Sequence, residues 1–315
     1  MEEYKADILR YIKSFLRAQD FLVSEEYTSG MFAFDIIAKN DGETYLIKVS
    51  YNIDSLKSDL VIEMQRFASS FNISALVIGV RSGTGFLEDG IIYFRHRMPI
   101  MTPGTFSEYI RGNRPYIYSG PGGYYVPIDG RKMQEARVSS GSSIGYVSGR
   151  IGLSRRSISL YESGSSTTLD VFEKLVEILK ADISRTIDLM EITREWGNIS
   201  ENGVEEDLFM NLARKMLTEL GIMTETFRKF PFNALGKSED RDMFVMGLFE
   251  ELSKNASRVP TIKQISDFVE KEPIIIVEEK TERDSIGGCQ VISLKEIKER
   301  GLSRILENRE RKGVR

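Results

Sequence analysis

One stretch near the middle of the chain constrains its fold more than any other, because two short amphipathic runs flank a single glycine there. Ser143 and Ser154 each precede one run, where a hydroxyl can accept from the unpaired backbone N–H groups of a new helix. Gly152 lies between the runs and supplies a tight turn. We therefore expect helices over residues 144–151 and 155–162 that cross at a steep angle.

Two further runs complete a helical domain around this pair. Residues 131–140 precede it, and residues 168–179 follow it after a loop of serine and glycine. The last run places apolar side chains at helical spacing, at Leu169, Phe172, Leu175, Val176 and Leu179. With the small residue Ser148 ahead of the glycine turn, this pattern resembles the helix-turn-helix of the Cro and C1 repressor family.

The resemblance implies that the third helix enters the major groove of double-stranded DNA with its first residues at base edges. Arg155 and Arg156 are the implied guanine-reading side chains, because one guanidinium can donate to both O6 and N7. Leu160 would meet a thymine methyl, and Ser159 would be a further base contact. The implied phosphate contacts are Ser143, Ser157, Ser163 and Ser165.

The resemblance also implies a structural ion pair. Arg137 on the first helix and Glu162 at the end of the third occupy positions that form a partly buried pair in this family. The chain departs from the family at Ile144, where a glutamine often touches the DNA backbone, so one phosphate contact is weakened.

The charge distribution fits a nucleic-acid partner better than the total charge does. The chain has a net charge of -4, yet the stretch from Arg95 to Leu160 holds ten Arg or Lys against three acids. Because local charge governs phosphate binding, this basic stretch favours DNA. A helix-turn-helix that serves only for protein interaction remains the alternative.

The first 110 residues show the order helix, strand, hairpin, helix, strand, strand, which indicates a compact α/β domain. Asn40-Asp41-Gly42 joins the hairpin strands, and we expect Asp-Gly to supply its positive φ angles. Residues 111–130 indicate a short linking hairpin, which either packs on the next domain or touches DNA. The expected domains are residues 1–110, 111–130, 131–195 and 203–315.

The last domain follows the plan of the first, with a helix over 208–221, strands over 224–230, 243–249 and 273–279, and a helix over 261–271. The expected fold class is therefore multidomain α+β, a helix-turn-helix flanked by two small α/β domains. The shared order favours an internal duplication, although small α/β units can share such an order by chance.

The run FDIIAKNDGETYLIKVSY resembles the metal-dependent nuclease core of the restriction-endonuclease fold. Asp35 stands at the family's aspartate position, but the Glu and Lys positions fall on Lys48 and Ser50. An ammonium beside the would-be cation opposes metal binding, and Glu63 or Asp59 could restore only one ligand.

In the C-terminal domain Asn233 and Gly247 replace the two acids, and the EEK at Glu278–Lys280 lies on a later strand. We therefore expect two inactive nuclease-like domains that bind no metal and serve dimerisation or regulation.

Other features exclude several classes of protein. The single cysteine, Cys289, excludes an intrachain disulfide and a zinc site built from cysteines. The single histidine, His96, is flanked by arginines, and we expect it to lie on the surface. The apolar runs are shorter than the ~18 residues of a membrane span, so we expect a cytoplasmic protein that does not contact a membrane. The glycine-rich loop at 81–86 lacks a Walker lysine, and no cofactor is expected.

The complete domain order resembles an archaeal family of helix-turn-helix transcriptional regulators. It implies a sequence-specific regulator that binds double-stranded DNA and is not an enzyme. One short reading helix makes few contacts, so we expect a homodimer on a partly palindromic operator. A metal-dependent nuclease targeted by its helix-turn-helix and a module that docks an acidic protein are the alternatives, and no effector is indicated.

Overall fold

The computed structural model describes residues 2–27, 32–197, 199, 208–238, 243–279 and 283–300. Contacts group them into two compact units. The first holds residues up to Val23 together with Asn40–Gly197, and the second holds Ser24–Lys39 together with the described residues beyond Gly197. Lys280 and most of the expected boundary at 195–203 lie outside the described residues.

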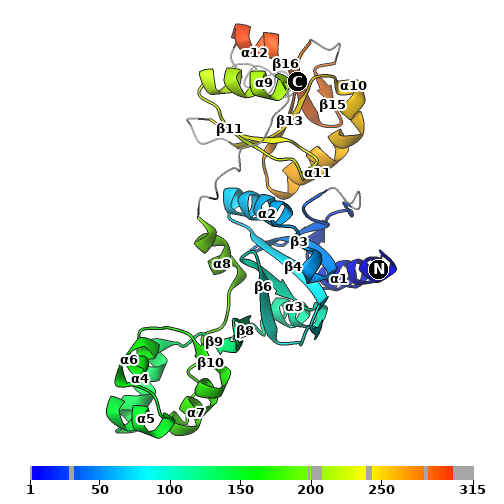
Figure 1. Ribbon diagram of the computed structural model, residues 1–315. Helices are drawn as coiled ribbons and strands as arrows, with labels where there is room; N and C mark the ends of the chain where they lie inside the picture. Colours follow the sequence, from blue (N-terminus) through cyan, green and yellow to red (C-terminus); the bar gives the residue numbers. More distant parts are fainter. Residues whose placement is uncertain are drawn as a thin grey trace. The chain divides into compact units, whose positions relative to one another are not determined.

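The first unit begins with an α/β domain (Figure 1), whose elements are α1 (Glu2–Ala18), β1 (Leu22–Val23), β3 (Thr44–Asn52), η1 (Ile53–Ser55), α2 (Ser58–Phe71), β4 (Ser74–Ser82), β5 (Gly85–Phe86), β6 (Ile91–Arg95), β7 (Met98–Met101) and α3 (Pro103–Ile110). β4 is parallel to both β3 and β7, and β6 is antiparallel to β7. α1 packs against β3, and both α2 and α3 pack against β4.

The turn at residues 40–43 differs from the expected one. Neither Asp41 nor Gly42 has a positive φ. The Asn40 Oδ1 atom instead accepts from the backbone N–H of Gly42 at 3.0 Å and of Glu43 at 2.8 Å. An asparagine side chain thus closes the turn by imitating a backbone acceptor.

A hairpin leads from this domain to the helices. β8 (Ile117–Gly120) lies parallel to β6, and β9 (Gly123–Val126) lies antiparallel to β8. β10 (Thr167–Thr168) then adds to β9. The hairpin therefore joins the sheet of the first domain to the helical domain through continuous strand pairing.

The helical domain consists of α4 (Gly130–Ser139), α5 (Ile144–Ile151), α6 (Arg155–Glu162) and α7 (Leu169–Leu179). One hydrophobic cluster holds these helices together, and its fully buried members include Met133, Val147, Ile158 and Leu175, one from each helix. Apolar residues at helical spacing thus form the core, as the periodicity predicts.

α8 (Leu189–Trp196) packs against α2 and β4 of the α/β domain. The Leu189 N–H donates to the Tyr109 hydroxyl at 3.1 Å, and the indole Nε1 of Trp196 donates to the Arg97 carbonyl at 3.2 Å. The sequence analysis expects the helical domain to run to residue 195 and so to include most of α8. In the structure α8 instead packs on the first α/β domain, which buries its apolar face.

The second unit contains another α/β fold, made of α9 (Leu208–Glu219), β11 (Met223–Thr226), β12 (Ala234–Lys237), β13 (Met243–Phe249), α10 (Leu252–Asn255), η2 (Ala256–Arg258), α11 (Val259–Phe268), β14 (Glu272–Val277), β15 (Ser285–Ile286), β16 (Cys289–Ser293) and α12 (Leu294–Arg300). Its strands lie in the order β11-β12-β13-β14-β16-β15. β14 is parallel to both neighbours, β13 and β16, and β15 is antiparallel to β16.

The two α/β folds share one topology. The order β3-β4-β7-β6 in the first matches β13-β14-β16-β15 in the second, with the same strand directions. The helices α1, α2 and α3 match α9, α11 and α12 in chain order. This correspondence is what an internal duplication predicts.

Residues 24–39, expected in the first domain, belong by their contacts to the second unit. They include β2 (Ile36–Lys39). The Tyr27 hydroxyl donates to Gln264 Oε1 at 2.6 Å, and the rings of Phe34 and Phe230 lie 5.1 Å apart. Burial of these aromatic rings explains the grouping, which local alternation of apolar residues does not reveal.

Candidate nucleic-acid interface

Serine caps begin both helices of the central pair. The Ser143 hydroxyl accepts from the Tyr146 N–H at 3.0 Å, and the Ser154 hydroxyl accepts from the Ser157 N–H at 3.1 Å. Gly152 ends α5 with φ 73°, a left-handed conformation that a side chain would strain. These local features fix the turn between α5 and α6.

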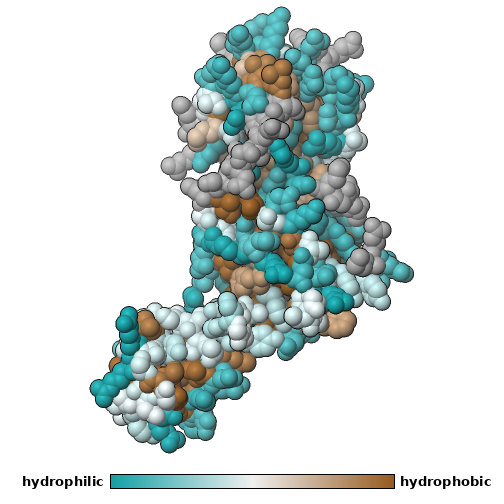
Figure 2. Space-filling view, in the orientation of Figure 1, coloured by the Kyte–Doolittle hydropathy of each residue, from teal (hydrophilic) through white to brown (hydrophobic). Residues whose placement is uncertain are grey.

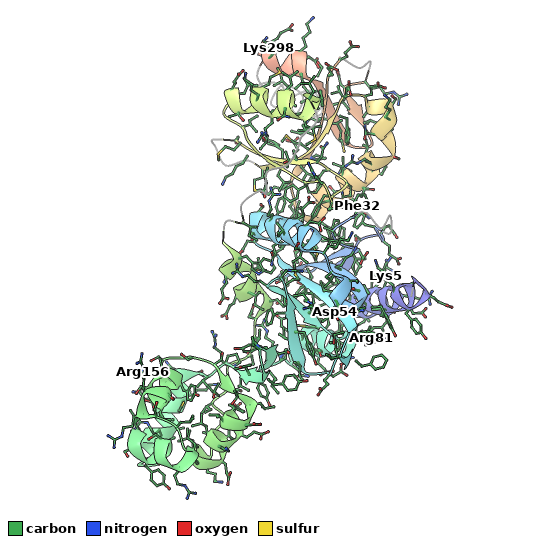
Figure 3. All side chains as sticks on the ribbon, viewed as in Figure 1. Lys5, Phe32, Asp54, Arg81, Arg156 and Lys298 are labelled. Atoms are coloured by element: carbon green, nitrogen blue, oxygen red, sulfur yellow. The ribbon has the colours of Figure 1, made fainter. Side chains whose placement is uncertain are left out.

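α6 buries one side chain and exposes its outer face. Ile158 is fully buried, whereas Arg155, Arg156 and Ser159 are exposed and Leu160 is 48% exposed. Figure 3 places Arg156 at the periphery of the helical domain. The outer face of α6 therefore offers two guanidinium groups, a hydroxyl and an apolar side chain.

The two arginines differ in their surroundings. A Cβ at Gly145 of α5 would lie 3.0 Å from an Nη atom of Arg155 and 3.2 Å from its Nε. The Arg155 guanidinium therefore rests over the start of α5, in space that the glycine leaves open. Arg156, at the next position, makes no hydrogen bond or ion pair with any described residue, so its guanidinium is open to an outside partner.

Most of the serine hydroxyls expected at the interface also form hydrogen bonds within the protein. The Ser157 and Ser154 hydroxyls lie 2.9 Å apart, and the Ser159 and Ser163 hydroxyls donate to carbonyls one turn earlier. Ser165 is exposed, and its hydroxyl makes no hydrogen bond to any described residue. All the hydroxyls keep lone pairs or rotational freedom for an outside partner.

Arg137 and Glu162 form a two-pronged ion pair between α4 and α6. Arg137 Nε donates to one carboxylate oxygen and its Nη2 to the other at 3.1 Å, while Nη1 donates to the Ser142 carbonyl at 3.0 Å. Their side chains are 12% and 10% exposed. Donation of hydrogen bonds to the Glu162 carboxylate raises the pKa of Arg137.

Gly130 provides a second contact between these helices, one that sequence reasoning missed. A Cβ at this position would lie 2.2 Å from the carbonyl oxygen of Glu162. The backbone at the start of α4 thus touches the backbone at the end of α6. Only the distance between the two backbones in the folded structure reveals such a contact, and no sequence signal marks it.

Positive charge on the outer surface is unbalanced. Arg131 and Lys132 on α4 pair with Glu135 and Asp129. By contrast, Arg150, Arg155 and Arg156 have no acidic partner among the described residues. Figure 2 shows pale and teal surface over much of this domain, interrupted by brown, hydrophobic residues. Its exposed large apolar and aromatic side chains include Val138, Tyr146 and Leu160. Unpaired arginines beside scattered apolar side chains suit a polyanion that also offers base edges.

The residues at the nuclease-like positions differ in burial. Asp35 and Lys48 are 1% and 8% exposed, and both make polar interactions within the protein. Glu63 is buried and Asp59 is exposed on α2. Among the described residues, no group of three or more His, Cys, Asp or Glu could hold a metal ion.

In the second unit, Asn233 has a structural role. Its Nδ2 donates to the Leu248 carbonyl at 2.7 Å, and its Oδ1 accepts from the Leu248 N–H at 2.6 Å. The amide therefore ties a loop to β13, at the position that the sequence analysis expects to correspond to Asp35.

The glycine-rich loop at 81–86 already holds a carboxylate. The Gly83 N–H donates to Asp54 at 2.5 Å, and Arg95 pairs with the same carboxylate. These contacts, the backbone hydrogen bond first, lower the pKa of Asp54. An internal anion thus occupies the loop. His96 is exposed on the neighbouring turn.

Comparison with known proteins agrees with the separation of an α/β domain from a helix-turn-helix domain. A PD-(D/E)XK superfamily domain model matches residues 5–115, and a helix-turn-helix model matches residues 133–185. The fold and the site thus define a helix-turn-helix protein with a nuclease-like α/β domain. The predicted fold class is confirmed.

Three archaeal relatives carry the name "Putative HTH-type transcriptional regulatory protein". The one from Picrophilus torridus is 42% identical over 95% of this chain and 94% of its own length. Those from Thermoplasma acidophilum and Archaeoglobus fulgidus are 38% and 32% identical, covering 99% and 87% of this chain and 100% and 87% of theirs. The chain belongs to this archaeal family of HTH-type transcriptional regulatory proteins.

No solved structure matches the chain. Among the described residues, no helix combines the length and apolar character needed to cross a membrane.

Proposed function

We propose that the protein is a cytoplasmic, sequence-specific transcriptional regulator that binds double-stranded DNA through α6. The observation that carries this proposal is the unbalanced charge of Arg150, Arg155 and Arg156 on the exposed surface of the helix-turn-helix domain. Such cations gain most from phosphates and guanine edges, since no acid among the described residues pairs with them. The names of the archaeal relatives support the same function.

Four side chains of α6 are the proposed base contacts: Arg155, Arg156, Ser159 and Leu160. Arg156 is the principal reader, because its guanidinium is free to donate to guanine O6 and N7. Arg155 rests over Gly145, so we assign it a second guanine contact close to the sugar–phosphate backbone.

The proposed phosphate contacts are Ser143, Ser157, Ser163 and Ser165, around the start of α5 and the two ends of α6. Ser165 is the strongest of them, because its hydroxyl has no partner among the described residues. Exposed backbone N–H groups at the start of α5 would add to these contacts, since helix N-termini favour anions.

We infer a homodimer on a partly palindromic operator. α6 has eight residues, so one copy touches few base pairs. Two copies separated by about one turn of DNA, roughly 34 Å, would double the number of base pairs contacted. Selection of bound fragments from random duplexes tests this inference. Paired half-sites about 10 base pairs apart are expected, and a lone asymmetric half-site would contradict the dimer.

We propose no catalytic role for the α/β domains. Lys48 and Asn233 occupy positions where the nuclease fold needs acids, and an ammonium or an amide cannot replace a carboxylate beside a divalent cation. The competing function, a DNA nuclease, is favoured only by the PD-(D/E)XK match. Plasmid incubated with the protein and Mg²⁺ or Mn²⁺ should stay intact. Metal-dependent nicking that disappears in Asp35→Ala would establish the nuclease instead.

A further inference from the structure

A pocket lies where the helical domain joins the first α/β domain. Its volume is about 190 Å³. Pro127 and Ser166 line it from the helical domain, and Phe94 and α8 line it from the α/β domain. The pocket therefore has room for a small molecule.

Among the charged residues that line the pocket, acids outnumber bases. Asp188, Glu191 and Glu195 line it against one cation, Arg185. Asp188 pairs with Arg114 and caps α8 through the Met190 N–H, and Glu191 lies 3.6 Å from Arg185. The Glu195 side chain has no hydrogen bond or ion pair with any described residue. Only the backbone carbonyl of Glu195 accepts a hydrogen bond, from the Arg97 side chain.

Aromatic rings form another part of the wall. Phe94 is 37% exposed although it is a large apolar residue. Its ring meets that of Tyr118 edge-on, with the centroids 6.2 Å apart and an angle of 80°. Both residues line the pocket. Ring faces beside carboxylates attract organic cations through cation–π and ionic interactions.

The geometry points to a binding site for a small organic cation, an ammonium group on an apolar body. The ammonium would meet Glu195, whose carboxylate is without a partner in the described structure, and the apolar body would lie against Phe94 and Tyr118. The site is distinct from the surface of α6, because its lining comes from β6, β8, α8 and the loops beside the helical domain.

The residues that line the pocket come from both domains of the first unit. A ligand in it touches both domains, so it would favour the arrangement of the helix-turn-helix that closes the pocket. This coupling rests on the proposed function, whereas ligand binding does not.

A strained turn holds one wall of the pocket in place. His96 and Arg97 join β6 to β7 with φ angles of 49° and 65°, unusual for residues with side chains. The Arg97 side chain donates to the Glu195 carbonyl at 2.9 Å, and its own carbonyl accepts from Trp196. The end of α8 is thereby anchored beside the pocket, and the single tryptophan of the chain reports on it.

Saturation-transfer NMR with phenethylamine tests the site. We expect saturable binding by the full-length protein, and at least about fivefold weaker binding of the neutral analogue 2-phenylethanol. Glu195→Gln should weaken phenethylamine binding about fivefold, whereas Glu173→Gln, an exposed acid on α7, should leave it unchanged. Absence of transfer, equal binding of the alcohol, or equal loss in both variants would overturn the proposal.

Trp196 fluorescence and DNA binding then separate the two claims. The fluorescence of Trp196 should change along the same saturation curve, which locates the ligand at α8. Phenethylamine should also shift the apparent Kd for a selected operator in the wild type and not in Glu195→Gln. Ligand binding without such a shift would refute the coupling and leave the site. Ligand binding by a protein that binds no DNA would refute the proposed function alone.

Discussion

At the scale of the residue, the packing of the helix-turn-helix depends on one close backbone contact and one mostly buried ion pair. Gly130 of α4 meets the Glu162 backbone at the end of α6, and the same Glu162 carries the ion pair with Arg137. Both contacts fix the position of α6 relative to α4. Substitutions at these sites should therefore change stability far more than substitutions on the outer surface.

Gly130→Ala should lower the free energy of unfolding by about 2–3 kcal/mol, because its methyl group would overlap backbone atoms that cannot move alone. Gly149→Ala on α5 is the matched control. Nothing lies within 4 Å of its Cβ position, and alanine favours helix, so stability should rise by about 0.5–1 kcal/mol. Urea denaturation measures both. Equal effects of the two substitutions would contradict the described packing.

Glu162→Gln should cost about 3 kcal/mol, because it leaves the Arg137 guanidinium mostly buried without its counter-charge. Arg131→Ala removes a surface pair whose side chains are 86% and 66% exposed, and it should cost less than about 1 kcal/mol. Thermal unfolding of both variants provides the comparison. Similar losses would mean that the ion pair of Arg137 is not buried in solution.

Some of these residue-scale features could be predicted from the sequence and others could not. The serine caps and the Gly152 turn depend on neighbours in the chain, so Ser143 and Ser154 could be assigned from local pattern. The contact of Gly130 and the bracing of Arg155 over Gly145 depend on how two helices approach, which no local pattern encodes.

At the scale of the element, helices were easier to predict than their packing partners. The periodicity of apolar residues predicts α5 and α6 with the observed ends. The strands β7 and β12 cannot be predicted as separate strands from the sequence, because four residues carry little alternation of apolar and polar side chains. The apolar face of α8 shows that the helix is buried, but it does not show which domain buries it.

The attachment of α8 should respond to alkaline pH. Burial raises the pKa of Tyr109 to about 12, and the hydroxyl accepts from the first residue of α8. Because the raised pKa means that the folded state holds the proton more tightly, stability is complete below about pH 10 and falls toward pH 12. Across this range the free energy of unfolding should fall less steeply with pH in Tyr109→Phe than in the wild type, by about 1.4 kcal/mol per pH unit. Parallel curves for the two proteins would contradict this contribution.

At the scale of the whole molecule, two α/β folds of one topology accompany a helix-turn-helix. The repeated order of elements made this architecture predictable from the sequence. The grouping of residues 24–39 with the second unit was not predictable, because it depends on aromatic contacts between distant segments. In our account the α/β folds support and regulate DNA binding.

The central claim is that α6 reads base sequence through Arg156. The most direct test is competition binding, with the affinity for a selected operator compared with that for random duplex at one salt concentration. Arg156→Ala should reduce this specificity ratio by about 10- to 100-fold, whereas Arg131→Ala on α4 should weaken both affinities alike and leave the ratio unchanged. An unchanged ratio in Arg156→Ala would contradict the account.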